Sequence, residues 1–565
     1  MPFIASASQS ATAANDAPPL TYVDVLYDHA GYLAAHQGRL GAGNLAGSSV
    51  GIVGAGMAGL SAAYLLSAMG AKVTVFEAGK RPGGRVYSLQ PVKGDAALFE
   101  LGAMRVPPSE QLFRYFANLF GVKPGGQFPD PGKVFTQIVF QNQTLDWPAG
   151  EPPPSEFSTV HQAWESLAGS MSAIQKNLTD PATFAAAQQA WQQLVYNAQQ
   201  PGPERGYSTI SFFQGLVQAF VENYAQYGLS APWGPQEFAL FGALGVGSGG
   251  FGPLYQVNFA EIMRLIVNGL ETNQQFYPGG LSALTDGFLA AVGGSIRYQS
   301  KVNIVYADPD SGKVLVGVEA GPGPAYPFDA VIIATTTRSM QVDMGLTEPP
   351  PRVTPQLSGA QNTAIRELHL MNSSKLFVLT KSKFWIPANG QPASLPANIQ
   401  TDGLVRGLYC LDYGAQSNYG VVLVSYTWGD DSTKTIAIKN ADERLHLLLN
   451  SLDAAVPAFV EVLRSQLVPG SATLVDWQDQ RQFYGAFKLN YPGQDPLNQS
   501  LYYQFLSSPN GIYLAGDSVG WCGGWIEGAL QTGVNAAAAV VAQLGGELYP
   551  NSPMTQTADL YQYGP

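Results

Sequence analysis

The sequence predicts an α/β fold in which a nucleotide-binding domain is assembled from separated segments, with a second domain inserted between them. A strand, a glycine turn, a helix and a second strand follow one another between residues 49 and 78. Strand-like runs return between about 276 and 336, and a strand, a Gly-rich loop and a long helix occupy residues 510–544. The first of these patterns is a βαβ unit, whose crossover is normally right-handed.

Length and composition indicate a large enzyme with a buried site. The chain has 565 residues, of which 46% are hydrophobic and 12% are charged. Soluble domains usually carry about 25% charged residues, so much of this chain is expected to be interior. The length predicts two or three interlocked domains.

Charge and cysteine content exclude several classes of function. The net charge of −12 comes from dispersed acidic residues, which disfavours binding to nucleic acid or to anionic membranes. Two cysteines form neither a disulfide framework nor a zinc cluster, so we expect a cytoplasmic protein. No early positive charge precedes an apolar run and no stretch offers about 20 apolar residues, so neither a secretion signal nor a membrane span is expected. The five histidines lack metal-like spacing, and no nucleophile or Walker motif occurs, so we expect no metal.

The order of elements gives a provisional domain map. The start of the chain is rich in Ala, Ser and Pro and reads as a loose arm, with a short helix near residues 22–35. Residues 158–266 are helical in texture, and alternating strands follow between about 345 and 490. The predicted parts are an arm (1–47), a nucleotide domain (48–110, 276–344 and 501–547), a substrate domain on a mixed sheet (111–157 and 345–500), a helical subdomain (158–275) and a tail (548–565).

The run "GAGMAG" predicts a Rossmann-like dinucleotide site. Gly54 permits a tight turn, Gly56 lets the backbone approach a pyrophosphate, and Gly59 lets the helix pack closely on the strand. Glu77 ends the next strand, where an acid can accept hydrogen bonds from a ribose 2′-OH. An acid there argues against a 2′-phosphate, which leaves NAD or FAD.

Two later segments favour FAD. In "RPGGRVYS", paired glycines stand beside an arginine, which suits close backbone approach and a charge on a second phosphate region. The strand "GIYLAGDS" ends in an acid that can hydrogen-bond the ribityl hydroxyls of a flavin. The residues concerned are Gly83, Gly84, Arg85, Gly516 and Asp517.

These motifs resemble the FAD-dependent amine oxidase family, and further stretches resemble its tryptophan 2-monooxygenase and bacterial L-amino-acid oxidase branch. The further stretches are "LGAMRVPPS", "FGALGVGSGGF", "SSKLFVLTKSKFW", "TDGLVRGLYCLDY", "VVLVSYTWGDD", "GAFKLNYPG" and "GGWIEGALQTGVNAA". The resemblance covers residues 22–544 and implies FAD as the cofactor. Besides the residues above, it places Gly102, Ala103, Met104, Arg105, Gly523, Gly524, Trp525 and Ile526 beside the flavin.

Arg105 is the first cation after Lys93, at the end of a mostly apolar run. From local sequence it could pair with Glu100 or a backbone carbonyl, or its planar fork of donors could clamp a substrate carboxylate. The resemblance implies the clamp, with the hydroxyl of Tyr426 added to it. Tyr426 could otherwise be an ordinary strand aromatic.

Four further residues carry open alternatives. Lys375 could snorkel to solvent, whereas the resemblance implies a hydrogen bond to a water near flavin N5 that assists reoxidation. Trp477 could be a core or surface aromatic, or it could line the substrate pocket. Gly523 and Gly524 could form a tight turn, or allow close approach to the flavin. Relatives often carry Glu where this chain has Gly429, which predicts one charge fewer near the clamp.

The resemblance implies FAD-dependent oxidation of an L-α-amino acid, by hydride transfer to flavin N5. We expect a tryptophan 2-monooxygenase that converts L-tryptophan and O2 to indole-3-acetamide, CO2 and water. The alternative is an L-amino-acid oxidase that releases a keto acid, ammonia and H2O2, and a more distant one is a flavin-binding scaffold without turnover. The expected partners are an aromatic L-amino acid, O2 and a second copy of the chain in a homodimer.

Overall fold

The predicted nucleotide-binding sheet is present and is entirely parallel. The computed structural model describes residues 22–25, 27–178, 180, 182–196, 206–243, 250–319, 325–348, 356–387 and 393–556. Adjacent strands pair in parallel throughout the sheet. Its strands come from three separated parts of the chain, as the sequence predicts. In spatial order they are β21 (Ile512–Leu514), β13 (Ala330–Ile333), β1 (Ser49–Val53), β2 (Lys72–Phe76) and β9 (Ile296–Arg297).

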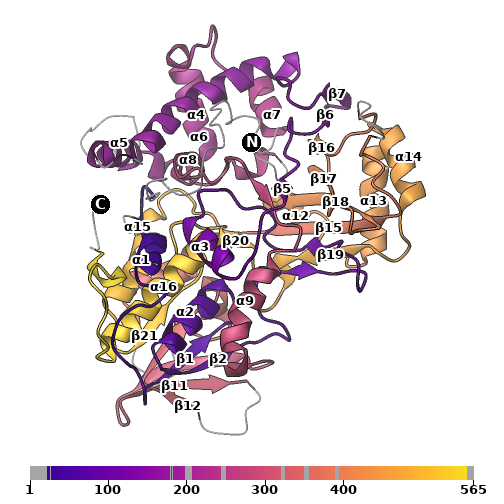
Figure 1. Cartoon of the computed structure of the whole chain (residues 1–565). Helices are drawn as coiled ribbons and strands as arrows, with labels where there is room; N and C mark the ends of the chain where they lie inside the picture. Colours follow the sequence, from indigo (N-terminus) through magenta and orange to yellow (C-terminus); the bar gives the residue numbers. More distant parts are fainter. Residues whose placement is uncertain are drawn as a thin grey trace.

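Both faces of this sheet are covered, which explains its continuous apolar strands. Val50 and Ile52 of β1 pack in the core formed with the helices, whereas Val53 packs in the core formed with the small sheet. Figure 1 shows the helices on one side and the strands β11 and β12 on the other. The helices are α2 (Met57–Ala68), α9 (Ser282–Val292) and α16 (Ile526–Gln543), and the small antiparallel sheet contains β10 (Val302–Asp308), β11 (Lys313–Val318) and β12 (Tyr326–Phe328).

The second large sheet is mixed, as predicted for the substrate domain. Its pairs are antiparallel except for β16 with β6. Helices α13 (Ala441–Asp453) and α14 (Pro457–Gln466) pack on one face of this sheet. The other face packs against the segment that contains Phe99, Leu101 and Met104. Its order is β19 (Thr473–Asp476), β15 (Ser373–Thr380), β18 (Gly420–Trp428), β17 (Gly407–Leu411), β16 (Asn398–Thr401), β6 (Thr136–Phe140) and β7 (Gln143–Trp147).

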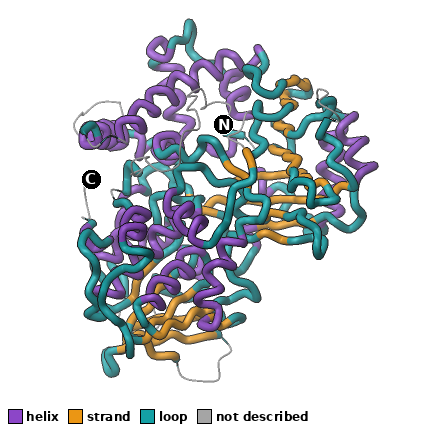
Figure 2. The backbone as a smooth tube through the Cα atoms, viewed as in Figure 1, coloured by secondary structure: helices purple, strands orange, loops and turns teal. Residues whose placement is uncertain are grey.

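A group of helices forms the third part of the molecule (Figure 2). Aromatic side chains fill its core: the ring centroids of Trp164 and Phe241 lie 5.2 Å apart, and those of Phe241 and Phe251 lie 4.4 Å apart. Residues 244–249 of the stretch "FGALGVGSGGF" lie outside the described residues. The helices are α4 (Ser158–Leu178), α5 (Phe184–Tyr196), α6 (Phe212–Val217), α7 (Pro235–Ala243) and α8 (Phe259–Val267).

Shorter elements connect these parts. Three two-stranded sheets pair β3 with β4, β5 with β8, and β14 with β20. The elements concerned are β3 (Ser88–Leu89), β4 (Phe99–Glu100), α3 (Gln111–Leu119), β5 (Gly126–Gln127), β8 (Gln275–Phe276), α10 (Thr337–Val342), α11 (Gly359–Glu367), β14 (Leu370–Met371), α12 (Gly429–Thr433), β20 (Phe487–Lys488) and α15 (Asp495–Tyr502).

The described part of the N-terminal arm differs from the expected loose segment. A helix forms only over α1 (His29–Ala35), and the turn before it is buried. Asp24 pairs with the guanidinium of Arg264 at 2.6 Å, and the backbone N–H of Val23 donates to Asn268 at 3.1 Å. Buried ion pairs that are also hydrogen-bonded hold this turn in place. Residues 1–21 and 557–565 lie outside the described residues, and the domain limits stay a prediction.

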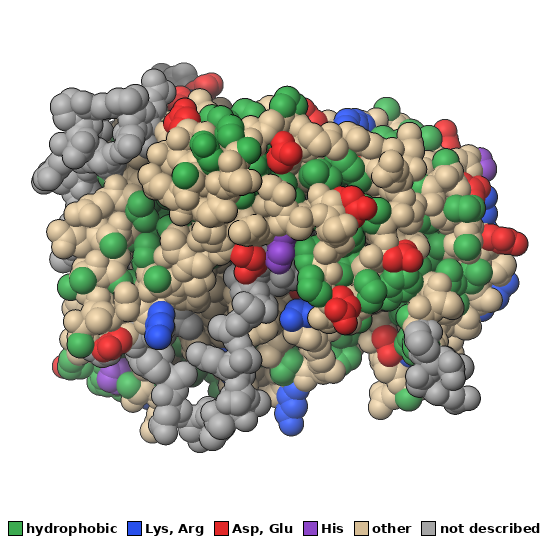
Figure 3. Space-filling model, turned by 90° about the horizontal axis from the view of Figure 1, so that it is seen from above, with side chains coloured by type: hydrophobic (Ala, Val, Ile, Leu, Met, Phe, Trp, Pro, Cys, Tyr) green, Lys and Arg blue, Asp and Glu red, His purple; other side chains and the backbone are tan. Residues whose placement is uncertain are grey.

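The distribution of charge on the surface and the character of the helices can be compared with two predictions from the sequence, dispersed acidic charge and no membrane span. Acidic side chains are scattered singly over the face seen in Figure 3, among apolar and uncharged groups. Within the described ranges, no helix combines the length and the apolar character that crossing a bilayer demands.

Candidate active site

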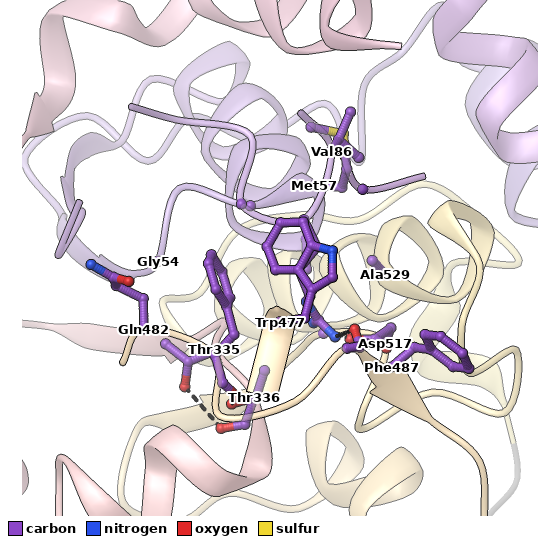
Figure 4. Close-up of a pocket in the computed structure, with 18 of the residues that line it drawn as sticks. Gly54, Met57, Val86, Thr335, Thr336, Trp477, Gln482, Phe487, Asp517 and Ala529 are labelled. Carbon is purple, nitrogen blue, oxygen red and sulfur yellow. Dashed lines mark hydrogen bonds and ion pairs between the residues drawn. The ribbon is translucent and has the colours of Figure 1, made fainter. Parts of the chain in front are cut away.

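A cavity lies between the parallel sheet and the mixed sheet. It extends from Lys301 and Asp343, near the edge of the parallel sheet, to Lys375 and Tyr426 on the mixed sheet. In Figure 4, Trp477 lies in the middle of the pocket, with Gly54 and Thr335 on one side and Asp517 and Phe487 on the other. All the residues predicted for the site except Gly59 line the cavity. They are Gly54, Gly56, Glu77, Gly83, Gly84, Arg85, Gly102, Ala103, Met104, Arg105, Lys375, Tyr426, Trp477, Gly516, Asp517, Gly523, Gly524, Trp525 and Ile526.

The three glycines of the first turn do different things. Gly54 has φ +102°, and a Cβ there would lie 2.6 Å from the carbonyl oxygen of Ala334. Gly59 is not among the cavity-lining residues; a Cβ there would lie 2.0 Å from the carbonyl oxygen of Gly54, so this glycine allows helix α2 to pack on the strand. Gly56 is the N-cap of α2, and a Cβ there would meet no protein atom within 4 Å. The open space at Gly56, in front of a helix N-terminus, is a cradle that suits a pyrophosphate.

Glu77 stands at the end of β2 and is tied to the same turn. Its carboxylate accepts hydrogen bonds from the backbone N–H groups of Ala55 at 2.9 Å and Gly79 at 2.7 Å. A carboxylate has about four acceptor positions, so it can still accept bonds from ribose hydroxyls. The geometry therefore fits the predicted ribose contact.

Arg85 and Asp517, each predicted to contact the cofactor separately, are paired with each other. An Nη of Arg85 binds the carboxylate of Asp517, and the other Nη donates to the carbonyl oxygen of Ala486 at 2.8 Å. Both side chains border the cavity beside the turn of Gly83 and Gly84, whose φ angles are +92° and +60°. The pair can therefore present a donor and an acceptor to a ligand that runs along the turn.

The N-terminus of α16 forms another part of the wall. Trp525 is the N-cap of this helix, and Gly524 before it has φ +83°. A Cβ at Gly523 would lie 2.5 Å from Cε of Lys488 and 2.6 Å from its carbonyl oxygen, so the tight turn requires glycine there. The positive end of the helix dipole at this wall favours negative charge in the cavity.

The side chain of Arg105 is 8% exposed and is not paired with Glu100. Its Nη1 lies 3.2 Å from Oε2 of Glu271 and 3.8 Å from Oδ1 of Asp130. Its Cζ lies 6.0 Å from the ring centroid of Trp525. Burial acts to lower the pKa of Arg105, but the two carboxylates raise it, so the guanidinium stays charged. Glu100 instead accepts from the hydroxyl of Ser88 and the backbone N–H of Leu281.

Lys375 does not snorkel to solvent. Its side chain is 2% exposed, and Nζ donates to the carbonyl oxygens of Glu100 at 3.0 Å and Gly102 at 2.5 Å. Burial lowers the pKa of Lys375 to about 7, against the opposing effect of Glu100. A neutral amine has two N–H bonds, so both can be used by these carbonyls while its lone pair stays available to a ligand or water.

Aromatic side chains surround the cavity near Lys375. Tyr426 lies opposite Lys375 in the paired strands β15 and β18, with Nζ 4.7 Å from the tyrosine ring centroid. The Nε1–H of Trp477 donates to the carbonyl oxygen of Leu101 at 2.9 Å, which fixes the indole in the wall. Trp428 and Phe487 add two more rings, with centroids 5.2 Å apart. Such walls suit a flat, apolar ligand group.

Sequence reasoning missed several of these residues. Glu271, Trp428 and Phe487 line the cavity, and Asp130 lies behind Arg105. Trp428 carries a detectable signal, because it lies two residues after Tyr426 on the same face of the strand. Gly429 is not among the cavity-lining residues, and its φ of +56° accounts for the glycine there. No cluster of metal-ligating side chains occurs among the described residues.

Comparisons with known proteins give the family to which most of the chain is similar. Residues 57–541 match the family model described as flavin containing amine oxidoreductase. The chain is 37% identical to tryptophan 2-monooxygenase of Pantoea agglomerans pv. gypsophilae and 36% identical to that of Pseudomonas savastanoi, in each case over 96% of this chain and 98% of the relative. A phenylalanine 2-monooxygenase precursor of a Pseudomonas species is 26% identical over 90% of this chain and 89% of its own length.

Solved structures share the fold. Cyclohexylamine oxidase from Brevibacterium oxydans IH-35A gives a TM-score of 0.65 at 16% identity, over 88% of this chain and 99% of that one. Putrescine oxidase bound to putrescine gives 0.62 at 19% identity, with the same coverage. These likenesses confirm the predicted fold class.

Proposed function

The chain belongs to the family of flavin-containing amine oxidoreductases, and we propose that within this family it acts as a tryptophan 2-monooxygenase. It is an FAD-dependent oxidoreductase. The observation that carries the substrate proposal is the charged guanidinium of Arg105, whose side chain is 8% exposed and lines an aromatic-walled cavity. The identity of 37% to a tryptophan 2-monooxygenase, over nearly the whole chain, supports the choice of L-tryptophan.

The cofactor would be held by the residues that line the cavity along the carboxyl ends of the parallel strands. The backbone at Gly56 and the N-terminus of α2 receive the pyrophosphate, and Glu77 binds the ribose. The Arg85–Asp517 pair and the N-terminus of α16 would face the remaining part of the FAD molecule. Bound FAD supplies a hydride acceptor and, once reduced, a reductant for O2.

The substrate is oriented by its two ends. Arg105 presents two parallel N–H donors to the carboxylate, and the hydroxyl of Tyr426 adds a third donor. The indole packs among Trp428, Trp477 and Phe487, where offset and edge-to-face ring contacts stabilise it. Held at both ends, the α-carbon and amine lie between the guanidinium and the rings. Positioning of this kind is the protein's main contribution to the rate.

The activity is tested with purified, yellow holoprotein and a panel of the twenty L-amino acids. We expect L-tryptophan to be consumed fastest, with indole-3-acetamide and CO2 as products by mass spectrometry and little peroxide. A keto acid with stoichiometric ammonia and peroxide would instead identify an L-amino-acid oxidase. Failure of every amino acid to bleach the flavin anaerobically would leave a binding protein without turnover and would refute the proposal.

Lys375 is proposed to act in the reaction with oxygen, through a hydrogen-bonded water. We expect Lys375→Met to slow reoxidation by O2 by roughly 10²-fold, the lower end of the usual contribution of a positioned acid or base. Flavin reduction by the amino acid should change much less. Because burial lowers the pKa of Lys375 to about 7, the wild-type reoxidation rate should rise with pH through about 7, as the amine loses its proton and can accept a hydrogen bond.

The measurement is stopped-flow reoxidation of the reduced enzyme between pH 6 and 9. Lys439→Met is the matched control, because this lysine is 55% exposed and pairs with Asp479 at the surface. A Lys375→Met enzyme that keeps the wild-type rate and pH profile would remove this residue from the oxygen reaction.

A further inference from the structure

Glu271 lies beside the guanidinium of Arg105, and both residues line the cavity. It follows helix α8, is 2% exposed and lines the cavity. Its Oε2 lies 3.2 Å from Nη1 of Arg105, and its Oε1 lies 3.5 Å from Nη2. The side chain of Gln274 donates to Oε2 at 3.4 Å and holds the carboxylate in place. Asp130, 3.8 Å from Nη1, is not among the cavity-lining residues.

The charges around Arg105 do not favour a simple carboxylic acid. One guanidinium already faces two carboxylates, so a bound carboxylate would bring a third negative charge into a buried cluster. Like charges in a poorly solvated site are costly unless a positive group accompanies them. An α-amino acid brings such a group, because its ammonium is separated from its carboxylate by a single carbon atom.

The same geometry brings the ammonium to Glu271. A carboxylate that binds Arg105 lies next to the donors that Glu271 also contacts, since both of its oxygens are within 3.5 Å of the guanidinium. The neighbouring ammonium is therefore within reach of the Glu271 carboxylate. A charge-assisted hydrogen bond between them would offset the added negative charge.

We propose that Glu271 recognises the α-ammonium group of the substrate and removes one proton from it, in support of the amino-acid oxidation proposed above. An N–H bond of the ammonium breaks and its electron pair stays on nitrogen, while the proton forms an O–H bond with Glu271. The neutral amine then has a lone pair that assists loss of hydride from the α-carbon. Glu271 is therefore a catalytic residue as well as a specificity residue.

The surroundings of Glu271 fit a proton acceptor. Burial raises the pKa of its carboxyl group, and Arg105 opposes this while Asp130 adds to it. Tyr426 also faces it, with a hydroxyl whose own pKa burial raises, so this group stays neutral. Lys375 lies opposite Tyr426 on the neighbouring strand β15, and it is close enough to Arg105 for the two positive charges to interact. A carboxylate with a raised pKa is a stronger base than an exposed one.

The test separates the two ends of the substrate. It compares L-tryptophan with indole-3-propionate, which lacks the ammonium, and tryptamine, which lacks the carboxylate. Dissociation constants come from anaerobic changes in the visible flavin spectrum, and stopped flow gives the rate of flavin reduction against pH. We expect Glu271→Gln to bind indole-3-propionate at least about tenfold more tightly than the wild type, because one negative charge is gone.

The rate should respond in the opposite direction. We expect Glu271→Gln to reduce its flavin with L-tryptophan roughly 10²-fold more slowly near neutral pH, the scale of a lost general base. The wild-type rate should rise with pH as Glu271 ionises, and the variant should lose that step and follow the substrate ammonium. Asp130→Asn removes the same charge outside the cavity lining, so it should tighten indole-3-propionate but keep the pH step.

Each outcome bears on one proposal. Glu271→Asp keeps the charge, so it should retain the wild-type weakness towards indole-3-propionate and part of the rate, whether or not the glutamine variant folds. A wild-type flavin that no amino acid reduces would refute the proposed function. A wild type reduced by L-tryptophan, with Glu271 variants unchanged in propionate affinity, rate and pH profile, would overturn the role of Glu271 alone.

Discussion

Replacing Arg105 with alanine is expected to lower kcat/KM for the amino acid by about 30- to 4000-fold while FAD stays bound. Truncating one partner of a buried, hydrogen-bonded charge pair costs roughly 2–5 kcal/mol, and each 1.4 kcal/mol corresponds to about a tenfold change. The substrate would lose its carboxylate partner. In addition, Glu271 and Asp130 would both lose the Arg105 cation that they contact, which disfavours an anionic ligand further.

The pattern of the loss identifies its cause. Tryptamine has no carboxylate, so its affinity should not fall in the Arg105→Ala enzyme. Arg105→Lys keeps the charge but not the planar fork of donors, and should fall between the two. Arg464→Ala, at an arginine that is 38% exposed and pairs with Asp453, serves as the control. Steady-state kinetics with flavin content and thermal unfolding check the prediction, and unchanged kinetics would exclude the carboxylate clamp.

The parts of the fold that sequence alone predicts are those with local causes. The run "SVGIVGAG" is apolar and ends in a glycine turn, and the structure has β1, the turn and α2 there. The mixed sheet was likewise marked by long apolar strands such as β15 and β18, which are buried on both faces. Arg105 and Lys375 were conspicuous because a single cation in an apolar run needs a partner.

The carboxylates that pair with these cations are brought to them by the tertiary fold, and no local sequence pattern identifies them. Arg85 meets Asp517 across 432 residues of chain, and Arg105 meets Glu271 across 166. Glu100, the nearest acid before Arg105 in the sequence, is taken up by Ser88 and the N–H of Leu281. Which carboxylate reaches which cation follows from how the sheets and helices pack, so the charge balance of the site could not be read from the sequence.

Substitutions at the glycines of "GAGMAG" can distinguish an effect on FAD binding from an effect on folding. Gly56 has φ −80° and ψ −176°, a backbone conformation open to any residue. A Cβ there would meet no protein atom within 4 Å, although the residue lines the cavity. We therefore expect Gly56→Val to fold as well as the wild type and to lose FAD, because its side chain would project into the space meant for the pyrophosphate.

The expected size follows from the hydrogen bonds that the side chain would block. Each hydrogen bond to a charged group contributes roughly 1.5–3 kcal/mol, so losing one or two backbone contacts to phosphate lowers affinity by between about tenfold and about 10⁴-fold. Titration of FAD into apoprotein, followed by flavin fluorescence, measures this loss. Circular dichroism and thermal unfolding of the apoprotein should remain as in the wild type.

Two other glycines give opposite results for the same substitution and so test the reasoning. Gly59→Ala places Cβ 2.0 Å from the carbonyl oxygen of Gly54, so it should lower the stability of the apoprotein itself, since the backbone cannot yield without separating α2 from the sheet. Gly169 lies in helix α4, and a Cβ there would meet no atom within 4 Å beyond the backbone of its own helix turn. Gly169→Ala should therefore lower neither FAD affinity nor stability, because alanine favours a helix. If Gly56→Val binds FAD as the wild type does, the pyrophosphate does not lie at this turn, and the cofactor must enter the cavity in another orientation.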